Sequence, residues 1–360
     1  MHLPLEKLLE AVCNSDRIYS TQFPNHVDNH FEKYTGIVNK LKRHVYPSIN
    51  LGLAVSSGDI GIYTDHGEEH FDEVVKYAGY MLGLNTEADI ENALEEVVNN
   101  KWHFYPYEIY ILLLCIRFHD VGNIHGREQH EHNIMKVMHG LSFYNLEDPN
   151  ERKMISRIAG SHGGKTLDGN KDTIGNLEKG FKISNVVDIR QQRIAGVVRF
   201  ADEICENRNR NHSPLLTIPE GNEVYHKYTE IIKANCLTNS VFDIHYDIHK
   251  NDAINTWGKT VDDDVKQVYL TEEIISRLTK MELERRYCNR FLPEDVRINS
   301  ISVEIEIYAD AEVDYGCPEV IKKESFVLED SGYPSHGDGI IPEETCNKIS
   351  GETLIQELSE

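Results

Sequence analysis

The feature that most constrains this chain is an apolar segment, residues 107–118, which ends directly on His119 and Asp120. The segment is too short to span a bilayer. Its apolar residues run nearly all round a helix, which predicts a central helix surrounded by others. An imidazole and a carboxylate at the end of a buried helix are costly unless something compensates them. A divalent metal ion beyond the helix end would contact both. The alternative is a structural pair, in which His119 bonds to a carbonyl and Asp120 caps the next turn.

Composition limits the class of protein. The 360 residues are 40 % hydrophobic and 27 % charged, as in soluble globular proteins, and suffice for one large domain or two. No apolar window is long enough for a membrane span, and the first residues lack the features of a signal peptide. Seven cysteines without a Cys-x-x-Cys pair indicate reduced thiols in the cytoplasm and argue against a zinc ribbon.

The net charge of −23 argues against a protein that binds long nucleic acids, because clustered Lys and Arg hold the phosphate backbone. Small anionic substrates are easier to accommodate, and neither a long nucleic acid nor a membrane is the expected partner. A homo-oligomer stays open as an alternative. Many of the 18 histidines lie between residues 66 and 162, which is typical of a metal site.

Further helices carry metal-ligating residue types on their apolar faces. His70, His130 and His162 fall on inward-facing stripes, and Asp202 lies on an apolar stripe of a long helix. An acid is rarely buried without a partner. Helices that converge can supply a mixed nitrogen and oxygen site. Such ligands suit Mn, Fe, Ni or Zn better than an all-oxygen magnesium cage.

Periodicity and turn residues predict the remaining elements. Strands are expected at 241–249 and 301–307, with a helix at 271–292 between them, as a small sheet appended to a helical body. The alternating face of Asp243, His245, Asp247 and His249 is interpreted as a solvated strand face rather than a row of ligands. Other expected elements are helices at 3–12, 26–45, 87–99 and 186–206, and loops at 52–61 and 169–184.

Three segments in this order resemble the HD-domain superfamily of metal-dependent phosphohydrolases. They are His70-x-x-x-Val74, Phe118-His119-Asp120-Val121-Gly122 and Arg199-Phe200-Ala201-Asp202-Glu203. The opening Thr64-Asp65-His66-Gly67-x-x-His70 is similar to a bacterial subset of that superfamily. The resemblance spans about residues 60–210. It implies a mainly α fold, an HD-domain helical bundle with a small appended β-sheet as an α+β C-terminal part.

The corresponding domain organisation has four parts. Residues 1–60 are expected to pack as N-terminal helices on the core, and 61–212 to form an HD-type metal-binding helical core. Residues 213–311 are expected to form an α+β extension with two or more strands, and 312–360 an acidic, loosely folded tail.

The resemblance also implies a ligand set for one or two divalent ions per chain (Mn, Fe, Ni, Zn or Mg). The core metal ligands would be His70, His119, Asp120 and Asp202. Members with two metals add histidines after the His-Asp helix, and the candidates in this chain are His130 and His162.

One departure from the superfamily pattern concerns the residue that follows the His-Asp pair. Several members carry a Lys or Glu there that contacts phosphate or activates water, whereas this chain has Asn123. If kept, that role would pass to His125, Arg127 or Glu128.

The remaining hypotheses concern catalytic and phosphate-binding residues, most of them outside the set of metal ligands. Asp120, His125 and Arg127 are the candidate catalytic residues, with His125 placed to protonate the leaving oxygen. The candidate phosphate-binding residues are Arg127, Lys165, Arg208 and Arg210. Taken singly, each of these Arg and Lys residues is more often an ordinary surface residue than a phosphate ligand.

The predicted function is therefore metal-dependent phosphohydrolysis of a nucleotide or cyclic (di)nucleotide in the cytoplasm. One alternative is a nuclease of the same fold that acts on single-stranded nucleic acid. The other is a non-catalytic metal- or nucleotide-binding regulatory module, which Asn123 favours.

Overall fold

The chain divides into two compact units. The computed structural model describes residues 2–15, 22–24, 29–56, 67–140, 146–166, 169–183, 187–207, 218, 220–262, 264–310, 318–332 and 339–358. The first unit comprises Met1–Asp59, His66–Cys205 and Cys288–Arg297, and the second comprises Ile60–Asp65, Glu206–Tyr287 and Ile298–Glu360. The described chain is mainly α-helical, as predicted. The four predicted domain boundaries remain predictions.

The first unit consists mainly of helices. They are α1 (Pro4–Cys13), α3 (His30–His44), α4 (Tyr46–Ser56), α5 (Glu68–Met81), α6 (Glu87–Val98), α7 (Pro106–Phe118), η1 (Val121–His125), α8 (His130–Gly140), α9 (Pro149–Gly160), α10 (Gln191–Ile204) and η4 (Glu294–Val296). A two-stranded ladder joins β1 (Phe181–Ile183) to β2 (Val187–Ile189).

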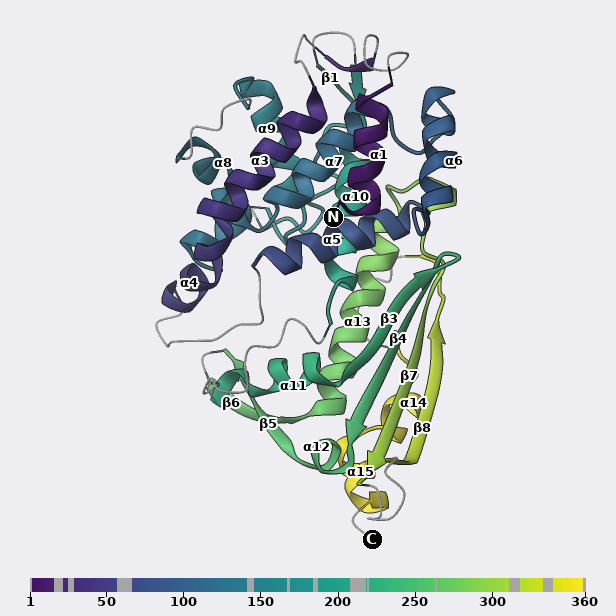
Figure 1. Cartoon of the computed structure of the whole chain (residues 1–360). Helices are drawn as coiled ribbons and strands as arrows, with labels where there is room; N and C mark the ends of the chain where they lie inside the picture. The colour runs from purple at the N-terminus through teal and green to yellow at the C-terminus, as the bar shows by residue number, and fades with distance from the viewer. Residues whose placement is uncertain are drawn as a thin grey trace. The chain divides into compact units, whose positions relative to one another are not determined.

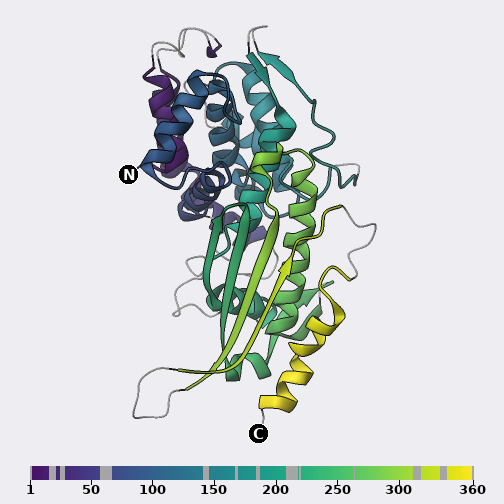
Figure 2. The same ribbon diagram turned by 90° about the vertical axis from the view of Figure 1, so that its right-hand side faces the viewer.

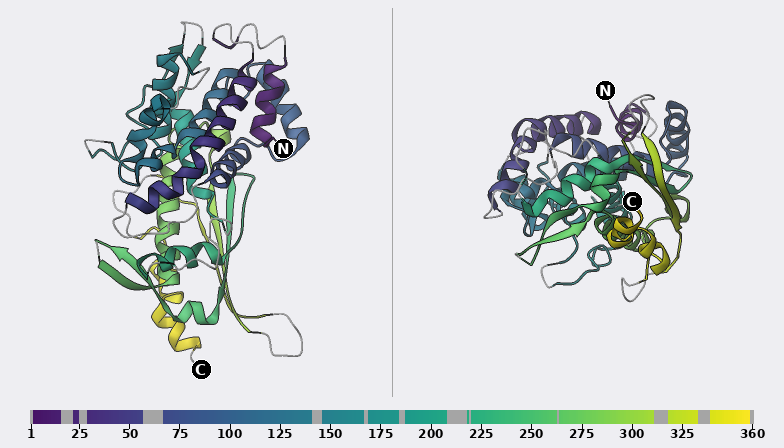
Figure 3. Two further views of the ribbon diagram at one scale, coloured as in Figure 1. Left: turned by 60° about the vertical axis from the view of Figure 1, so that its left-hand side comes forward. Right: turned by 90° about the horizontal axis from the view of Figure 1, so that it is seen from below.

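Helix α7 is the centre of this unit, as its sequence predicts. Every residue from Pro106 to Phe118 is buried, and α7 packs against α1, α3, α5, α9 and α10 (Figure 1; Figure 3, left). Pro106 occupies the first turn, where its missing N–H costs no hydrogen bond. The Glu108 carboxylate accepts the Tyr105 N–H at 2.8 Å, which satisfies one of the free donors at the helix start. The helix therefore carries His119 and Asp120 into the interior of the unit.

A buried ionic network ties α7 to three neighbouring helices. The Arg117 side chain is 1 % exposed; it donates to Glu6 of α1 at 2.8 Å and to the Tyr34 hydroxyl of α3 at 2.9 Å. Arg117 also pairs with Asp72 of α5. The Tyr46 hydroxyl donates to the Arg117 carbonyl at 3.0 Å. A charge buried this deeply is tolerated because several groups compensate it.

The segment 52–61, expected to be a loop, is helical in its described part, since α4 extends to Ser56. Pro47 does not end helical structure here, because it lies in the first turn of α4, where proline is tolerated. Gly52 is required by packing: a Cβ at this position would lie 2.5 Å from the Asn123 carbonyl oxygen. Close contact between α4 and η1 thus overrides the local preference of small residues for a loop.

The segment 169–184, expected to be a mobile surface loop, is partly buried in its described residues. Thr173 is 5 % exposed and Ile174 is fully buried. The Thr173 hydroxyl donates to the Ser161 carbonyl at 2.8 Å, which fixes this segment against the end of α9. The following helix begins at Gln191 rather than 186, because residues 187–189 pair as β2.

The second unit contains a four-stranded sheet in the order β3-β4-β7-β8, with the long helix α13 running beside it (Figure 1, Figure 2). Its elements are η3 (Glu220–Asn222), α11 (Glu223–Ile231), β3 (Ile232–Thr238), β4 (Val241–His249), α12 (Lys250–Ile254), β5 (Thr256–Val261), β6 (Asp264–Tyr269), α13 (Leu270–Asn289), β7 (Ser300–Ala309), β8 (Glu319–Leu328), α14 (Glu343–Lys348) and α15 (Gly351–Leu358). Helix α13 belongs to this unit as far as Tyr287.

The predicted strands 241–249 and 301–307 are confirmed as β4 and β7, which pair in parallel. A parallel pair needs a long crossover connection, and α13 lies within it. Phe242, Ile244, Tyr246 and Ile248 face the core, as the alternation predicts. Residues 319–328, within the segment expected to be a loose tail, form β8 and pair antiparallel with β7. The strand was missed because several of its alternate residues are charged.

Within the described residues no helix is long and apolar enough to cross a membrane.

Protonation of His30 is expected to destabilise the first unit at acid pH. The residue is 1 % exposed and packs against Phe23 and Tyr107. Burial lowers the pKa of His30 to about 3, and the nearby Lys33 ammonium adds to this effect. Since free histidine titrates near pH 6.5, the unfolded chain binds the extra proton first as the pH falls. This contribution to stability is complete above about pH 6.5 and is lost progressively toward pH 3, by up to about 1.4 kcal/mol per pH unit.

Urea unfolding between pH 4 and pH 8 tests this expectation. The free energy of unfolding of the wild-type protein should fall more steeply with decreasing pH than that of a His30→Phe variant, which keeps the aromatic packing. Equal slopes for the two proteins would contradict it.

Candidate metal centre

His119 and Asp120 directly follow the last residue of α7, and both side chains lie in the interior of the unit. His119 is fully buried and Asp120 is 3 % exposed. Asp120 is the N-cap residue of η1, but its side chain accepts no capping hydrogen bond. The alternative in which Asp120 caps the next turn is therefore wrong. The His119 Nδ1–H does donate to a carbonyl, that of Ile116 at 2.8 Å, which leaves Nε2 facing the other direction.

The first group of converging ligand atoms comes from α5, α7 and α10. His70 Nε2 lies 3.2 Å from His119 Nε2 and 3.3 Å from Asp202 Oδ1. His119 Nε2 lies 3.4 Å from the same Asp202 oxygen. These three residues form a set with the composition and spacing of a metal site. We refer to His70, His119 and Asp202 as cluster 1.

The second group comes from the end of α7 and from α8 and α9. His130 Nε2 lies 2.9 Å from Asp120 Oδ1 and 3.1 Å from His162 Nε2. His162 Nε2 lies 3.3 Å from Asp120 Oδ1. We refer to Asp120, His130 and His162 as cluster 2.

Asp120 connects the two clusters. Its Oδ1 belongs to cluster 2, while its Oδ2 lies 3.7 Å from both His70 Nε2 and His119 Nε2 of cluster 1. A carboxylate can bind two metal ions through its two oxygens. Each cluster could hold one metal ion, and Asp120 would then contribute an oxygen to each of them.

All four imidazoles present Nε2 to the centre because Nδ1 is engaged elsewhere. The Nδ1–H groups of His119, His130 and His162 donate to the carbonyls three residues earlier, at 2.8, 3.0 and 2.6 Å respectively. The Nδ1–H of His70 points to Cys205 Sγ at 3.5 Å. Such contacts fix the tautomer and orientation of metal-binding histidines.

The two close Nε2 pairs test whether the donor set fits a divalent ion. When Nδ1 carries the hydrogen, neutral imidazoles place bare lone pairs 3.2 Å apart in cluster 1 and 3.1 Å apart in cluster 2. A proton or a metal ion must compensate them. Ligand atoms that bind one metal at about 2.0–2.1 Å lie roughly 3.0–3.4 Å from each other. The observed separations fit this range, so the donor set suits a divalent ion.

Comparison with known proteins agrees with this geometry. The family model HD-CE matches residues 60–262, which is more than half of the 360 residues. The chain belongs to the HD-CE family. This confirms the predicted HD-type domain, and the match extends beyond the predicted limit near residue 210. Residues 64–66 of the Thr64–His70 opening lie outside the described residues. No curated protein and no solved structure matches the chain.

The electrostatics of this candidate centre in the HD-CE protein would couple metal binding to pH. Burial lowers the pKa of His119, but the carboxylates of Asp120 and Asp202 outweigh it and raise the pKa to about 9. Burial raises the pKa of Asp202, but His119 and His70 outweigh it and hold the pKa well below its usual value. Without metal, the centre therefore balances its carboxylates by binding a proton on His119. Metal binding must displace that proton, so the affinity should fall as the pH decreases below about 9.

The structure brings together the six predicted ligands but leaves several second-line candidates on the surface. His125, Arg127 and Lys165 are exposed, and Arg208 and Arg210 lie outside the described residues. Their catalytic and phosphate-binding roles remain predictions.

Two residues near the candidate ligands have a supporting role that the sequence did not predict, although Arg199 belongs to the matching segment Arg199–Glu203. Cys205 follows Asp202 by three residues at the end of α10, and its thiol donates to the Asp202 carbonyl at 3.0 Å. Arg199 donates to the Gly163 carbonyl at 3.0 Å and to Thr173 Oγ1 at 2.8 Å, which fixes the chain around His162. The available signal was the spacing from Asp202: Arg199 lies about one helical turn before it and Cys205 about one turn after it.

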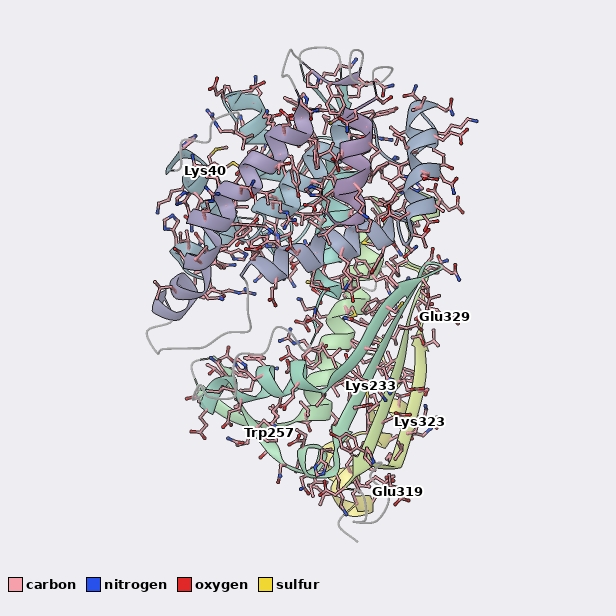
Figure 4. All side chains as sticks on the ribbon, in the orientation of Figure 1. Lys40, Lys233, Trp257, Glu319, Lys323 and Glu329 are labelled. Carbon is pink, nitrogen blue, oxygen red and sulfur yellow. The ribbon has the colours of Figure 1, made fainter. Side chains whose placement is uncertain are left out.

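A third group of ligand-type side chains lies in the second unit. It consists of His245 and Asp247 on β4 with Glu304 and Glu306 on β7. Figure 4 labels two lysines on the sheet, Lys233 and Lys323. They bind these carboxylates at 2.7–3.5 Å. Since the charges are already compensated, we interpret this group as an ion-pair network on a partly solvated strand face.

Proposed function

We propose that this HD-CE protein is a metal-dependent phosphohydrolase acting on a nucleotide or a cyclic (di)nucleotide. The observation that carries the proposal is the pair of three-ligand clusters joined by Asp120. An arrangement with two adjacent ion sites is typical of enzymes that displace a group at phosphorus.

The ligands determine the charge of the loaded centre. His70, His119 and Asp202 would hold one divalent ion, and His130, His162 and Asp120 the other. Bound divalent ions acidify water and neutralise charge on phosphoryl oxygens. The six ligands contribute only two carboxylates, so two divalent ions leave the centre with a net positive charge. This attracts a phosphate even though the whole chain carries −23.

The overall charge favours a small substrate. A surface of net charge −23 repels a long polyanion more than a mononucleotide or a cyclic dinucleotide. The exposed Arg127 and Lys165, together with Arg208 and Arg210, are proposed to bind phosphate groups outside the metal centre. His125 is proposed to protonate the leaving oxygen. Burial and the nearby Lys136 lower its pKa, which favours the transfer of a proton it has acquired.

A substrate and metal screen tests the proposal. Metal-free protein would be loaded with Mn, Fe(II), Ni, Zn or Mg and incubated with nucleotides, cyclic dinucleotides and single-stranded oligonucleotides, and the products separated by chromatography. Hydrolysis of nucleotides or cyclic dinucleotides is expected. Product ladders from oligonucleotides would instead identify a nuclease, and bound metal without turnover of any phosphoester would identify a regulatory module.

A matched pair of variants on α8 provides the control. His130→Ala removes a ligand of cluster 2 and is expected to abolish turnover, whereas His132→Ala changes a partly exposed histidine on the same helix and should leave turnover unchanged. Equal activity of the two variants would contradict the proposed centre.

A further inference from the structure

Glu131 carries a mostly buried carboxylate that the proposed ligand set does not use. Its side chain is 13 % exposed, and its Oε2 lies 3.2 Å from Nδ1 of His130, the candidate ligand that precedes it on α8. Among the described residues no lysine or arginine pairs with this carboxylate, and the other histidine beside it, His132, lies 4.0 Å from Oε1. A carboxylate that is largely removed from water needs a compensating charge. The closest group that can carry one is the His130 imidazole.

Two glycines at the end of α9 leave space for Glu131. A Cβ at Gly160 would lie 2.8 Å from the Glu131 carbonyl oxygen, which is closer than nonbonded atoms approach. A Cβ at Gly163, the residue after the candidate ligand His162, would lie 3.1 Å from Glu131 Cδ and 3.2 Å from its Oε1. The absence of side chains at both positions lets α8 pack directly on α9. This packing holds the Glu131 carboxylate beside cluster 2.

Cluster 2 has less negative charge of its own than cluster 1. Its candidate ligands are two imidazoles and Oδ1 of Asp120, whose Oδ2 faces cluster 1. Cluster 1 has the Asp202 carboxylate in addition. A divalent ion in cluster 2 would therefore be compensated mainly by imidazole nitrogens, and positive charge would develop on His130 and His162. A carboxylate behind a metal-binding histidine stabilises that charge and makes the imidazole a stronger ligand.

We infer that Glu131 is a positioning residue for His130, whose carboxylate raises the affinity of cluster 2 for a divalent ion; this inference rests on the metal centre of the proposed function. The His130 Nδ1–H donates to the Arg127 carbonyl at 3.0 Å, so Glu131 acts through its charge beside that hydrogen bond rather than in place of the acceptor. In cluster 1 the corresponding Nδ1 atoms of His119 and His70 contact a carbonyl and a thiol. The effect of Glu131 is therefore specific to cluster 2.

Glu131→Gln tests the inference, because glutamine keeps the shape of the side chain and removes its charge. The substitution is made in two backgrounds that each keep one complete cluster, Asp202→Ala for cluster 2 and His162→Ala for cluster 1. The matched control is Glu69→Gln, because Glu69 also neighbours a candidate ligand in the sequence, His70, but is exposed. The probe is Co(II), whose affinity is measured by competition with a chelator and whose visible absorption reports its ligands.

In the Asp202→Ala background, Glu131→Gln should weaken Co(II) binding about 10-fold or more and shift the visible absorption of the bound ion. In the His162→Ala background the same substitution should change neither quantity. Glu69→Gln should change neither quantity in either background. The melting temperatures of the metal-free proteins should stay close to those of their parent variants, because glutamine keeps the packing against Gly163.

Three results would overturn the inference. The first is an Asp202→Ala protein that binds no Co(II), and the second is one that binds it equally well with and without Glu131→Gln. The third is an equal loss of affinity in both backgrounds or a large fall in the metal-free melting temperature, which would show that Glu131 acts through the fold. A wild type that binds metal and hydrolyses no phosphoester, while the expected difference between the backgrounds is observed, would refute the proposed function and leave the role of Glu131 standing.

Discussion

Replacing Asp120 by alanine is expected to remove both metal ions and all measurable turnover. Asp120 contributes Oδ1 to cluster 2 and brings Oδ2 to within 3.7 Å of both histidines of cluster 1. Loss of an outer supporting residue typically weakens metal binding about 10–100-fold. Asp120 acts directly on both clusters, so the loss of affinity should exceed about 100-fold. The variant also brings four imidazoles together without the carboxylate that compensates them.

Variants that each remove a ligand of only one cluster are the controls for this prediction. Asp202→Ala should lose one ion and keep the other, because Asp120, His130 and His162 remain in place. His162→Ala should show the opposite loss. Elemental analysis is therefore expected to give two, one, one and no ions per chain for the wild type, Asp202→Ala, His162→Ala and Asp120→Ala. An Asp120→Ala protein that keeps two ions or full turnover would refute the shared-ligand geometry.

Arg117→Met is expected to cause the largest loss of stability, about 3–5 kcal/mol in the free energy of unfolding. The guanidinium is 1 % exposed and compensates Glu6 and Asp72. Methionine fills similar space but leaves the Glu6 carboxylate, which is 8 % exposed, without its charged partner. The cost arises from the uncompensated charge rather than from lost volume. Urea unfolding at neutral pH would measure it.

The matched control is Arg157→Met on the surface. Arg157 pairs with Glu178 at 3.5 Å, with side chains that are 50 % and 53 % exposed, so its removal should cost less than about 1 kcal/mol. A second variant, Arg117→Met with Glu6→Gln, should recover part of the loss because the buried charge is gone. Similar losses for Arg117→Met and Arg157→Met would show that the buried network contributes little.

The pH dependence of this network has a defined sign. Burial raises the pKa of Glu6, but Arg117, the Tyr34 hydroxyl and the Leu3 N–H outweigh it and lower the pKa below 4.5. The ion pair therefore stabilises the fold above about pH 4.5, and this stability is lost as the pH falls through the lowered pKa. In Arg117→Met the main lowering influence is absent, so this part of the acid dependence should disappear.

The six candidate ligands could be found from the sequence because helical periodicity reports which residues face inward. His70, His130, His162 and Asp202 each fall on an apolar stripe, and His119 and Asp120 end a helix that is apolar all round. In the turns between helices, the sequence has no periodicity that would predict which side chains face inward. The exposure of His125 and Lys165 depends on how η1 and the segment after α9 fold, which periodicity does not predict.

The features missed from the sequence arise from packing between distant segments. Gly52 reads as a loop residue, but its lack of a side chain serves contact between α4 and η1. Thr173 belongs to a polar, glycine-rich segment, yet it is buried because the Ser161 carbonyl and Arg199 bind it. In the sequence, Asn123 is notable only as a departure from a family pattern. Its amide, unpaired within the described residues, becomes evident once every neighbouring donor and acceptor is placed.

The main-chain carbonyls that orient His119, His130 and His162 belong to Ile116, Arg127 and Ala159. A carbonyl is present whatever side chain its residue carries. A substitution at one of those three positions that leaves the backbone in place therefore keeps the acceptor that orients the imidazole. Sequence similarity around such a centre can fade long before its coordination geometry does.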